Sequence, residues 1–83
     1  MTAPNIIEQE NEILRHAIDQ PGHWTIKTIS KELDLPKSTL RSRLGHLRAV
    51  GYLEKFSHKI TATDCGRVAY YKRTRIKETN RKK

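Results

Sequence analysis

The chain has little cysteine, no long apolar segment and few acidic residues. Its single cysteine, Cys65, has no partner for an internal disulfide, which argues against a disulfide scaffold and favours a reducing compartment. No apolar run approaches the roughly 18 residues that a membrane helix needs, so we expect no membrane span. The N-terminus lacks a basic segment followed by an apolar block, so no secretory signal is expected. With 83 residues the chain can form one small domain, which we expect to be cytoplasmic.

Basic residues are in excess, and the excess lies in the C-terminal two thirds of the chain. Residues 1–26 carry one base against four acids, whereas residues 27–83 carry 16 bases against five acids, and the whole chain has a net charge of +8. This distribution is typical of a small domain that binds a polyanion.

The apolar pattern predicts four helices. Ile7, Leu14 and Ile18 repeat at helical spacing in the first helix. The predicted helices begin at Asn5 and end before Pro21, then span 25–33, 37–50 and 63–77, with Thr25 and Thr63 as helix caps. Residues 1–77 are therefore expected to form the domain, and residues 78–83 a flexible basic tail.

The helix predicted over 37–50 has two distinct faces. Leu40, Leu44 and Leu47 form an apolar stripe, and Gly51 is suited to end the helix with positive φ. The line that points away from the leucines has small or hydroxyl side chains, namely Ser38, Ser42, Gly45 and Ala49. No acid occurs between Lys37 and Ala49, so nothing on this face would repel phosphate.

A β-hairpin is predicted between the third and fourth helices. Residues 52–56 alternate in polarity and are β-prone, the connection 57–59 is polar, and residues 60–62 return as a second strand. The predicted fold is thus mainly α with a small β-hairpin wing, a winged helix-turn-helix with about four helices. Across the short turn at 34–37, the helix 37–50 would be free to enter a major groove about 12 Å wide.

The segments Leu35-Pro36-Lys37-Ser38-Thr39-Leu40 and Gly51-Tyr52-Leu53-Glu54-Lys55 resemble the DNA-binding domains of IclR-type regulators. The later segment from Ile60 to Arg67 is similar to the post-wing strand and helix start of MarR-type and PadR-type regulators. The resemblance covers about residues 10–70 and implies DNA binding by the helix 37–50. The chain shows no ligand-sensing domain like that of IclR-type proteins, so no small-molecule effector is expected.

The candidate DNA-contacting residues are Lys37, Ser38, Thr39, Arg41, Ser42, Arg43 and His46 on the helix and His58 and Lys59 on the wing. Ser38 could instead cap the helix, and Arg43 could lie over the core leucines. Trp24 and Cys65 are expected in the core, and of Tyr52 and Phe56 one could face outward. No metal-ligand spacing and no catalytic arrangement is present, so we expect neither a metal, nor a cofactor, nor an enzyme.

The leading hypothesis is a sequence-specific regulator of transcription that binds double-stranded DNA, most simply as a repressor that occupies an operator. One helix reads few base pairs, so we expect a homodimer on two half-sites, formed through the first helix or the helix 63–77. A first alternative is a non-specific or architectural DNA-binding protein of replication, partition or packaging, including a Z-form binder. A second alternative is a winged-helix module that binds another protein through its acidic first helix.

Overall fold

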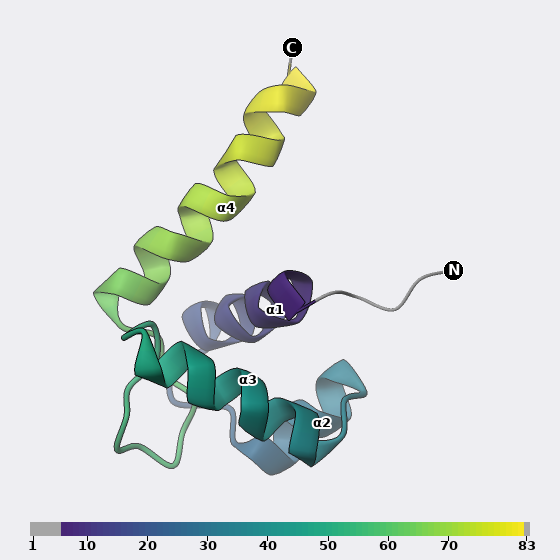
Figure 1. Ribbon diagram of the computed structural model, residues 1–83, viewed down its shortest axis with the longest axis vertical. Helices are drawn as coiled ribbons and strands as arrows, with labels where there is room; N and C mark the ends of the chain where they lie inside the picture. The colour runs from purple at the N-terminus through teal and green to yellow at the C-terminus, as the bar shows by residue number, and fades with distance from the viewer. Residues whose placement is uncertain (1–5, 83) are drawn as a thin grey trace.

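A computed structural model describes the backbone of residues 6–82 and the side chains of residues 6–74. Within this part of the chain there are four helices, α1 (Ile6–Asp19), α2 (Ile26–Leu33), α3 (Lys37–Ala49) and α4 (Asp64–Lys82) (Figure 1). The helices α1, α2 and α3 form the body of the domain, and α4 starts beside it and then extends away (Figure 1). The predicted architecture of about four helices is confirmed.

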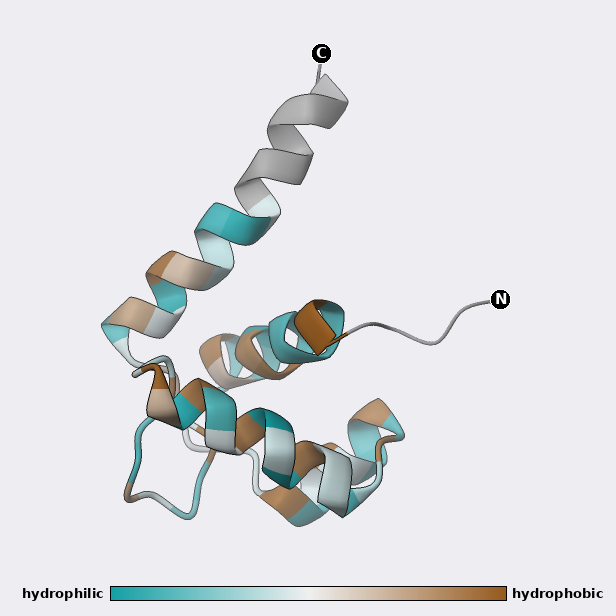
Figure 2. Ribbon diagram, viewed as in Figure 1, coloured by the Kyte–Doolittle hydropathy of each residue, from teal (hydrophilic) through white to brown (hydrophobic). Residues whose placement is uncertain are grey.

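The core lies where α1, α2 and α3 meet and is completed by residues from the segment after α3. Each helix carries apolar and polar residues side by side around its circumference (Figure 2). The buried apolar residues are Ile13, Leu14, Ala17, Ile29, Leu40, Leu44, Leu47, Leu53, Ile60 and Ala62. Trp24 packs against this cluster, as the sequence predicted. Ile7 does not, because its side chain is 49% exposed at the open end of α1.

The helices α2 and α3 form the helix-turn-helix. Thr25 caps α2 as predicted: its hydroxyl accepts a hydrogen bond from the backbone of Thr28, and the Thr28 hydroxyl accepts one from the backbone of Thr25. After α2 the chain turns at Asp34, which has a positive φ of 55° and whose backbone N–H donates to the carbonyl of Ser30. Pro36 then begins α3 in an extended conformation that suits the residue before a helix.

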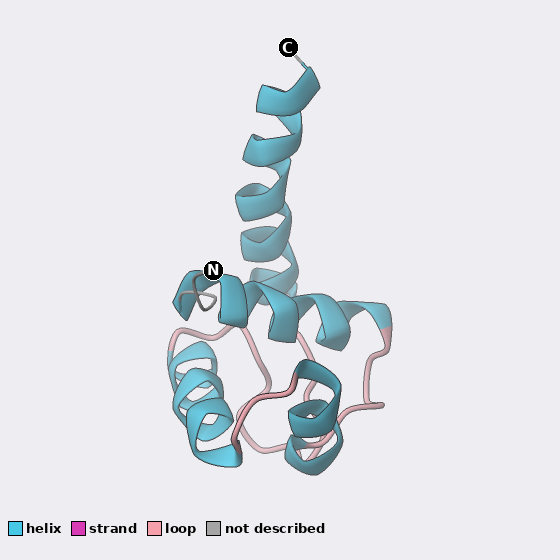
Figure 3. Ribbon diagram, turned by 90° about the vertical axis from the view of Figure 1, so that its right-hand side faces the viewer, coloured by secondary structure: helices cyan, strands magenta, loops and turns pink. Residues whose placement is uncertain are grey.

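The segment between α3 and α4 corrects the predicted β-hairpin wing. No regular strand is found among the described residues, and the segment is a loop (Figure 3). Leu53 and Ala62 form a single antiparallel bridge, and the N–H of Glu54 donates to the carbonyl of Thr61 at 2.9 Å. The chain turns directly after this bond, so the alternation of residues 52–56 has too few paired neighbours to extend a ladder. We keep the name wing for residues 53–62.

The start of α4 is fixed by a cap and a close backbone contact. Thr63 caps the helix as predicted, since its hydroxyl accepts a hydrogen bond of 3.1 Å from the N–H of Gly66. A Cβ atom at Gly66 would lie 2.1 Å from the carbonyl oxygen of Tyr52, so only glycine allows this approach. The helix continues to Lys82, past its expected end, and the side chains of the expected basic tail 78–83 lie outside the described residues.

Two side chains that were candidates for the core are exposed. Cys65 lies on the surface at the start of α4, which corrects its assignment as a small buried residue. Of the two aromatic residues near the wing, Tyr52 packs against the core and Phe56 is 100% exposed. The burial of Leu53 between them shows that the base of the wing is anchored while its tip points outward.

Candidate nucleic-acid interface

The inner face of α3 holds the helix on the body of the domain. Leu40, Leu44 and Leu47 are each at most 1% exposed, which confirms the predicted apolar stripe. The helix ends at Ala49 with Val50 as its C-cap, and Gly51 follows with a positive φ of 86°, as its role as a terminating glycine requires. Because the leucines fix the rotation of the helix, they also decide which residues face solvent.

The opposite side of α3 is open to solvent. Its exposed residues are Lys37, Ser38, Arg41, Ser42, Gly45 and Ala49, and we call them the outer face of α3. Ser38 makes no capping hydrogen bond, so its hydroxyl is available for other partners. A Cβ atom at Gly45 would meet nothing within 4 Å, so the space outside the middle of this face is open.

The edge of α3 nearest α1 is engaged by protein. The Nε of Arg43 donates to the side-chain oxygen of Gln9 at 2.8 Å. The Nδ1 of His46 lies 2.6 Å from a carboxylate oxygen of Glu10, a hydrogen bond in which the ring donates to the carboxylate. Arg43 is therefore partly buried against α1, whereas the His46 side chain is bonded to Glu10 and still 58% exposed, so it borders the outer face beside the small residues, where the sequence placed it. Thr39, on the same edge, is partly buried.

Glu10 is a buried residue behind the candidate interface, and the sequence analysis did not single it out. Its side chain is 0% exposed, and its second carboxylate oxygen lies 3.6 Å from a guanidinium nitrogen of Arg73 on α4. Arg73 also donates to the side chain of Asn11 at 3.0 Å and lies 5.6 Å from the ring centre of Tyr52. Glu10 thereby joins α1 to both α3 and α4, and His46 is the contact on α3. Its spacing from Ile13 and Ala17, at i+3 and i+7, is the signal that marks a buried position.

The edge of α3 nearest the wing differs from the α1 edge. Lys37 and Arg41 are exposed, and within the described residues neither has a hydrogen bond or an ion pair. Arg48, farther along this edge, donates to the backbone carbonyl of Ser57 at 3.2 Å and so attaches the wing to α3. Lys37 and Arg41 thus give the outer face two strong cationic donors with no protein partner within the described residues.

The tip of the wing adds an exposed histidine and an exposed lysine. His58 and Lys59 are exposed, as predicted, and the backbone N–H of Lys59 donates to the hydroxyl of Ser57 at 3.1 Å. The N–H of Ile60 donates to the carbonyl of Trp24 at 2.7 Å, which holds the returning arm of the wing on the segment before α2. The wing is therefore a short braced loop beside the C-terminal half of α3.

Other kinds of site receive no support from the described residues. Among them no group of three or more His, Cys, Asp or Glu side chains could hold a metal ion. A groove of about 340 Å³ lies between α1, the turn after α2 and α4, and none of the candidate DNA-contacting residues lines it. In the described part of the chain, no helix combines the length and the apolar character needed to cross a bilayer.

A comparison with protein families gives one match. The model of the IclR helix-turn-helix domain matches residues 12–56, more than half of the chain. The matched segment begins within α1, contains α2 and α3, and ends at the tip of the wing, so it includes the outer face of α3. No curated protein and no solved structure matches the chain.

Proposed function

Since this chain belongs to the family of IclR helix-turn-helix domains and is a DNA-binding regulator of transcription on that ground, we propose that it binds double-stranded DNA sequence-specifically. In this proposal α3 enters the major groove and the wing contacts the flanking backbone or the minor groove. The observation that carries the proposal is the outer face of α3, which is exposed, free of acids and includes two cations, Lys37 and Arg41, without a partner among the described residues.

The residues of the outer face have different roles in the proposal. Arg41 lies in the middle of α3 and contacts a base edge, where its forked guanidinium suits guanine. Lys37 lies at the helix start and contacts a phosphate, which fixes the register of the helix on the duplex. Ser38 and Ser42 are short enough to let the helix approach closely and still supply hydroxyl donors. Thr39 contributes at the border of this surface.

The residues on the α1 edge have a supporting role. Arg43 and His46 are already bonded to Gln9 and Glu10, and direct contact with DNA would compete with those hydrogen bonds. We therefore assign them to the orientation of α3 first and to the phosphates of the groove edge second. On the wing, His58 and Lys59 contact the backbone or the minor groove beside the site.

The proposal includes a homodimer on two half-sites about one helical turn apart, because a single reading helix distinguishes too few base pairs. Tyr71 on α4 is 52% exposed and Val68 is 53% exposed, so α4 presents apolar surface on which a second copy can pack. We further propose that the protein acts in the cytoplasm as a repressor, by occupying an operator.

The experiment that tests this function is selection of binding sites from a random DNA pool, followed by measurement of the mass of the complex. The expected result is enrichment of one palindromic sequence, bound by two copies of the chain. An affinity that is equal for selected and random duplexes and depends steeply on salt would contradict sequence specificity and support the architectural alternative. An absence of affinity for any duplex would contradict DNA binding and leave a protein-binding module.

A further inference from the structure

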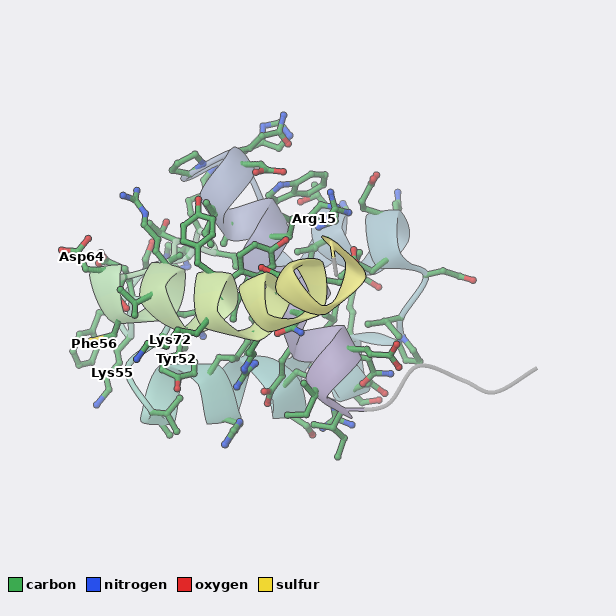
Figure 4. The ribbon with its side chains drawn as sticks, turned by 90° about the horizontal axis from the view of Figure 1, so that it is seen from above. Arg15, Tyr52, Lys55, Phe56, Asp64 and Lys72 are labelled. Carbon is green, nitrogen blue, oxygen red and sulfur yellow. The ribbon has the colours of Figure 1, made fainter. Side chains whose placement is uncertain are left out.

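Phe56 is the most exposed large apolar residue among the described side chains. Its ring is 100% exposed, whereas the other exposed large apolar residues are between 46% and 53% exposed. The ring points outward from the body of the domain, next to Lys55 (Figure 4). Turns favour small polar residues, so neither the local backbone nor the core explains a phenylalanine at this position.

The loop that carries Phe56 is held in place. Leu53 before it and Ile60 after it are at most 2% exposed, and both are part of the core. Arg48 of α3 donates to the carbonyl of Ser57, the residue that follows Phe56. The exposure of the ring is therefore a feature of an anchored loop.

The surroundings of Phe56 define the chemistry of its partner. Lys55 precedes it and Lys59 follows it by three residues in the same loop, both are exposed, and neither side chain has an ion pair within the described residues. Glu54 is the single acid of the wing. A partner that accepts an exposed aromatic ring from a loop with two exposed lysines has to offer an apolar slot bordered by negative charge. The step between two base pairs, with phosphates on both sides, has this chemistry.

The position of the wing fits the same partner. The contact between Arg48 and Ser57 places the wing beside the C-terminal half of α3. With α3 in the major groove, a loop attached there reaches over the backbone to the neighbouring minor groove. We propose that Phe56 is a wedge that enters the minor groove between adjacent base pairs, partly unstacks them and kinks the duplex. This inference rests on the proposed function and adds DNA bending to it.

The experiment measures bending and affinity on the same selected duplex. The ends of the duplex carry a fluorescent donor and acceptor, and 2-aminopurine replaces bases at successive steps outside the major-groove site. Wild-type protein should shorten the end-to-end distance, as a kink of about 20–90° requires, and raise the 2-aminopurine signal at one step. Phe56→Ser should lose both signals and lower the affinity by about tenfold, since an aromatic contact with a base is lost.

Two control variants separate the wedge from other effects. Phe56→Leu keeps an apolar wedge and should keep most of the bend. Lys55→Gln should lower the affinity and keep the bend, because it removes a charge beside the ring. Since the Phe56 ring is fully exposed, Phe56→Ser should unfold at the same urea concentration as wild type.

The outcomes distinguish this inference from the function on which it rests. If wild type binds the selected duplex without bending it, or if Phe56→Ser bends it as wild type does, the wedge is overturned and the proposed function stands. If Phe56→Ser converts a dimer into a monomer in the absence of DNA and leaves the bend intact, the ring packs on a second copy and the wedge is likewise overturned. If no duplex binds, both fail.

Discussion

The two edges of α3 carry the same kinds of residue and use them differently. On the α1 edge, Arg43 and His46 are bonded to side chains of α1. On the wing edge, Lys37 and Arg41 have no partner within the described residues. A basic residue in a reading helix is therefore not by itself a DNA contact, because what lies opposite its side chain decides whether protein or solvent receives it. Arg48 shows this within the wing edge, where it donates to the carbonyl of Ser57.

The difference has a physical origin in burial. Glu10 is fully buried, and a buried carboxylate requires charged or hydrogen-bonding partners, which α3 and α4 supply through His46 and Arg73. No acid stands on the wing edge of α3, so its cations remain in solvent at little cost. The α1 edge thus contributes to the position of α3, and on the wing edge Lys37 and Arg41 are left for a ligand.

The largest effect is expected on stability, from a substitution that removes the contact of Arg73 with the buried Glu10 carboxylate. Arg73→Met should lower the free energy of unfolding by about 2–3 kcal/mol, because the buried Glu10 carboxylate loses its nearby cation, and the hydrogen bond to Asn11 and the contact with the Tyr52 ring are lost with it. Lys72→Met is the matched control, since Lys72 is exposed and unpartnered on the same helix (Figure 4), and it should change stability by less than about 0.5 kcal/mol. Urea unfolding measures both, and equal changes would show that the Glu10 contact contributes nothing.

The next effect compares the two edges directly in DNA binding. Arg41→Ala should cost about 1–3 kcal/mol of affinity for the selected duplex and relax the preference at one position. Arg43→Ala should cost clearly less, because Arg43 is already bonded to Gln9. Affinity measured by fluorescence anisotropy on the selected duplex and on single-base variants checks this. A larger loss for Arg43→Ala would place the α1 edge in the groove as well.

A smaller effect separates the two residues of the wing edge. Lys37→Ala should weaken binding to all duplexes by the same factor and reduce the salt slope, the change of log affinity with log salt, by about one. The reason is that a lysine at the helix start neutralises one phosphate without reading a base. Titrations over a range of salt concentrations measure the slope, and an unchanged slope would remove Lys37 from the contact set.

The smallest effect concerns the side of α4 that faces the body. Burial raises the pKa of the Tyr70 phenol above 10.0, and the charge of Arg15 opposes this shift. The folded protein holds this proton more tightly than the unfolded chain, so the stabilisation is complete below about pH 10 and is lost as pH rises through the folded-state pKa. As the pH is raised from about 8 to about 11, the free energy of unfolding should therefore fall less for Tyr70→Phe than for wild type, as measured by urea unfolding. An identical loss in the two proteins would contradict the burial of this phenol.

The sequence was most informative where a feature depends on near neighbours. The caps at Thr25 and Thr63, the leucine stripe of α3 and the terminating Gly51 each involve residues a few positions apart, and each is confirmed. The IclR part of the family resemblance is confirmed as well, whereas the similarity of residues 60–67 to MarR-type and PadR-type regulators stays a prediction.

The failures of the sequence involve distant partners. The alternation of polar and apolar residues over 52–56 indicates which side chains could share one face of a strand. A β-ladder also needs a second strand that stays in register, and here only Leu53 and Ala62 pair. The contacts of Glu10 are with residues 46 and 73, so no local pattern names them. The assignment of Cys65 to the core failed because the rotation of α4 is set by its packing on α1 and by Gly66.

The amino-acid sequence by itself determined where α2, α3 and α4 begin, which leucines hold α3 and that the outer face carries no acid, since these depend on spacing and chemistry along one segment. The tertiary structure alone decided which basic residues of α3 have no protein partner and that a phenylalanine is exposed at the tip of the wing. Those facts depend on the angle at which α1, α4 and the wing meet α3, and that angle is set by the packing of residues far apart in the chain.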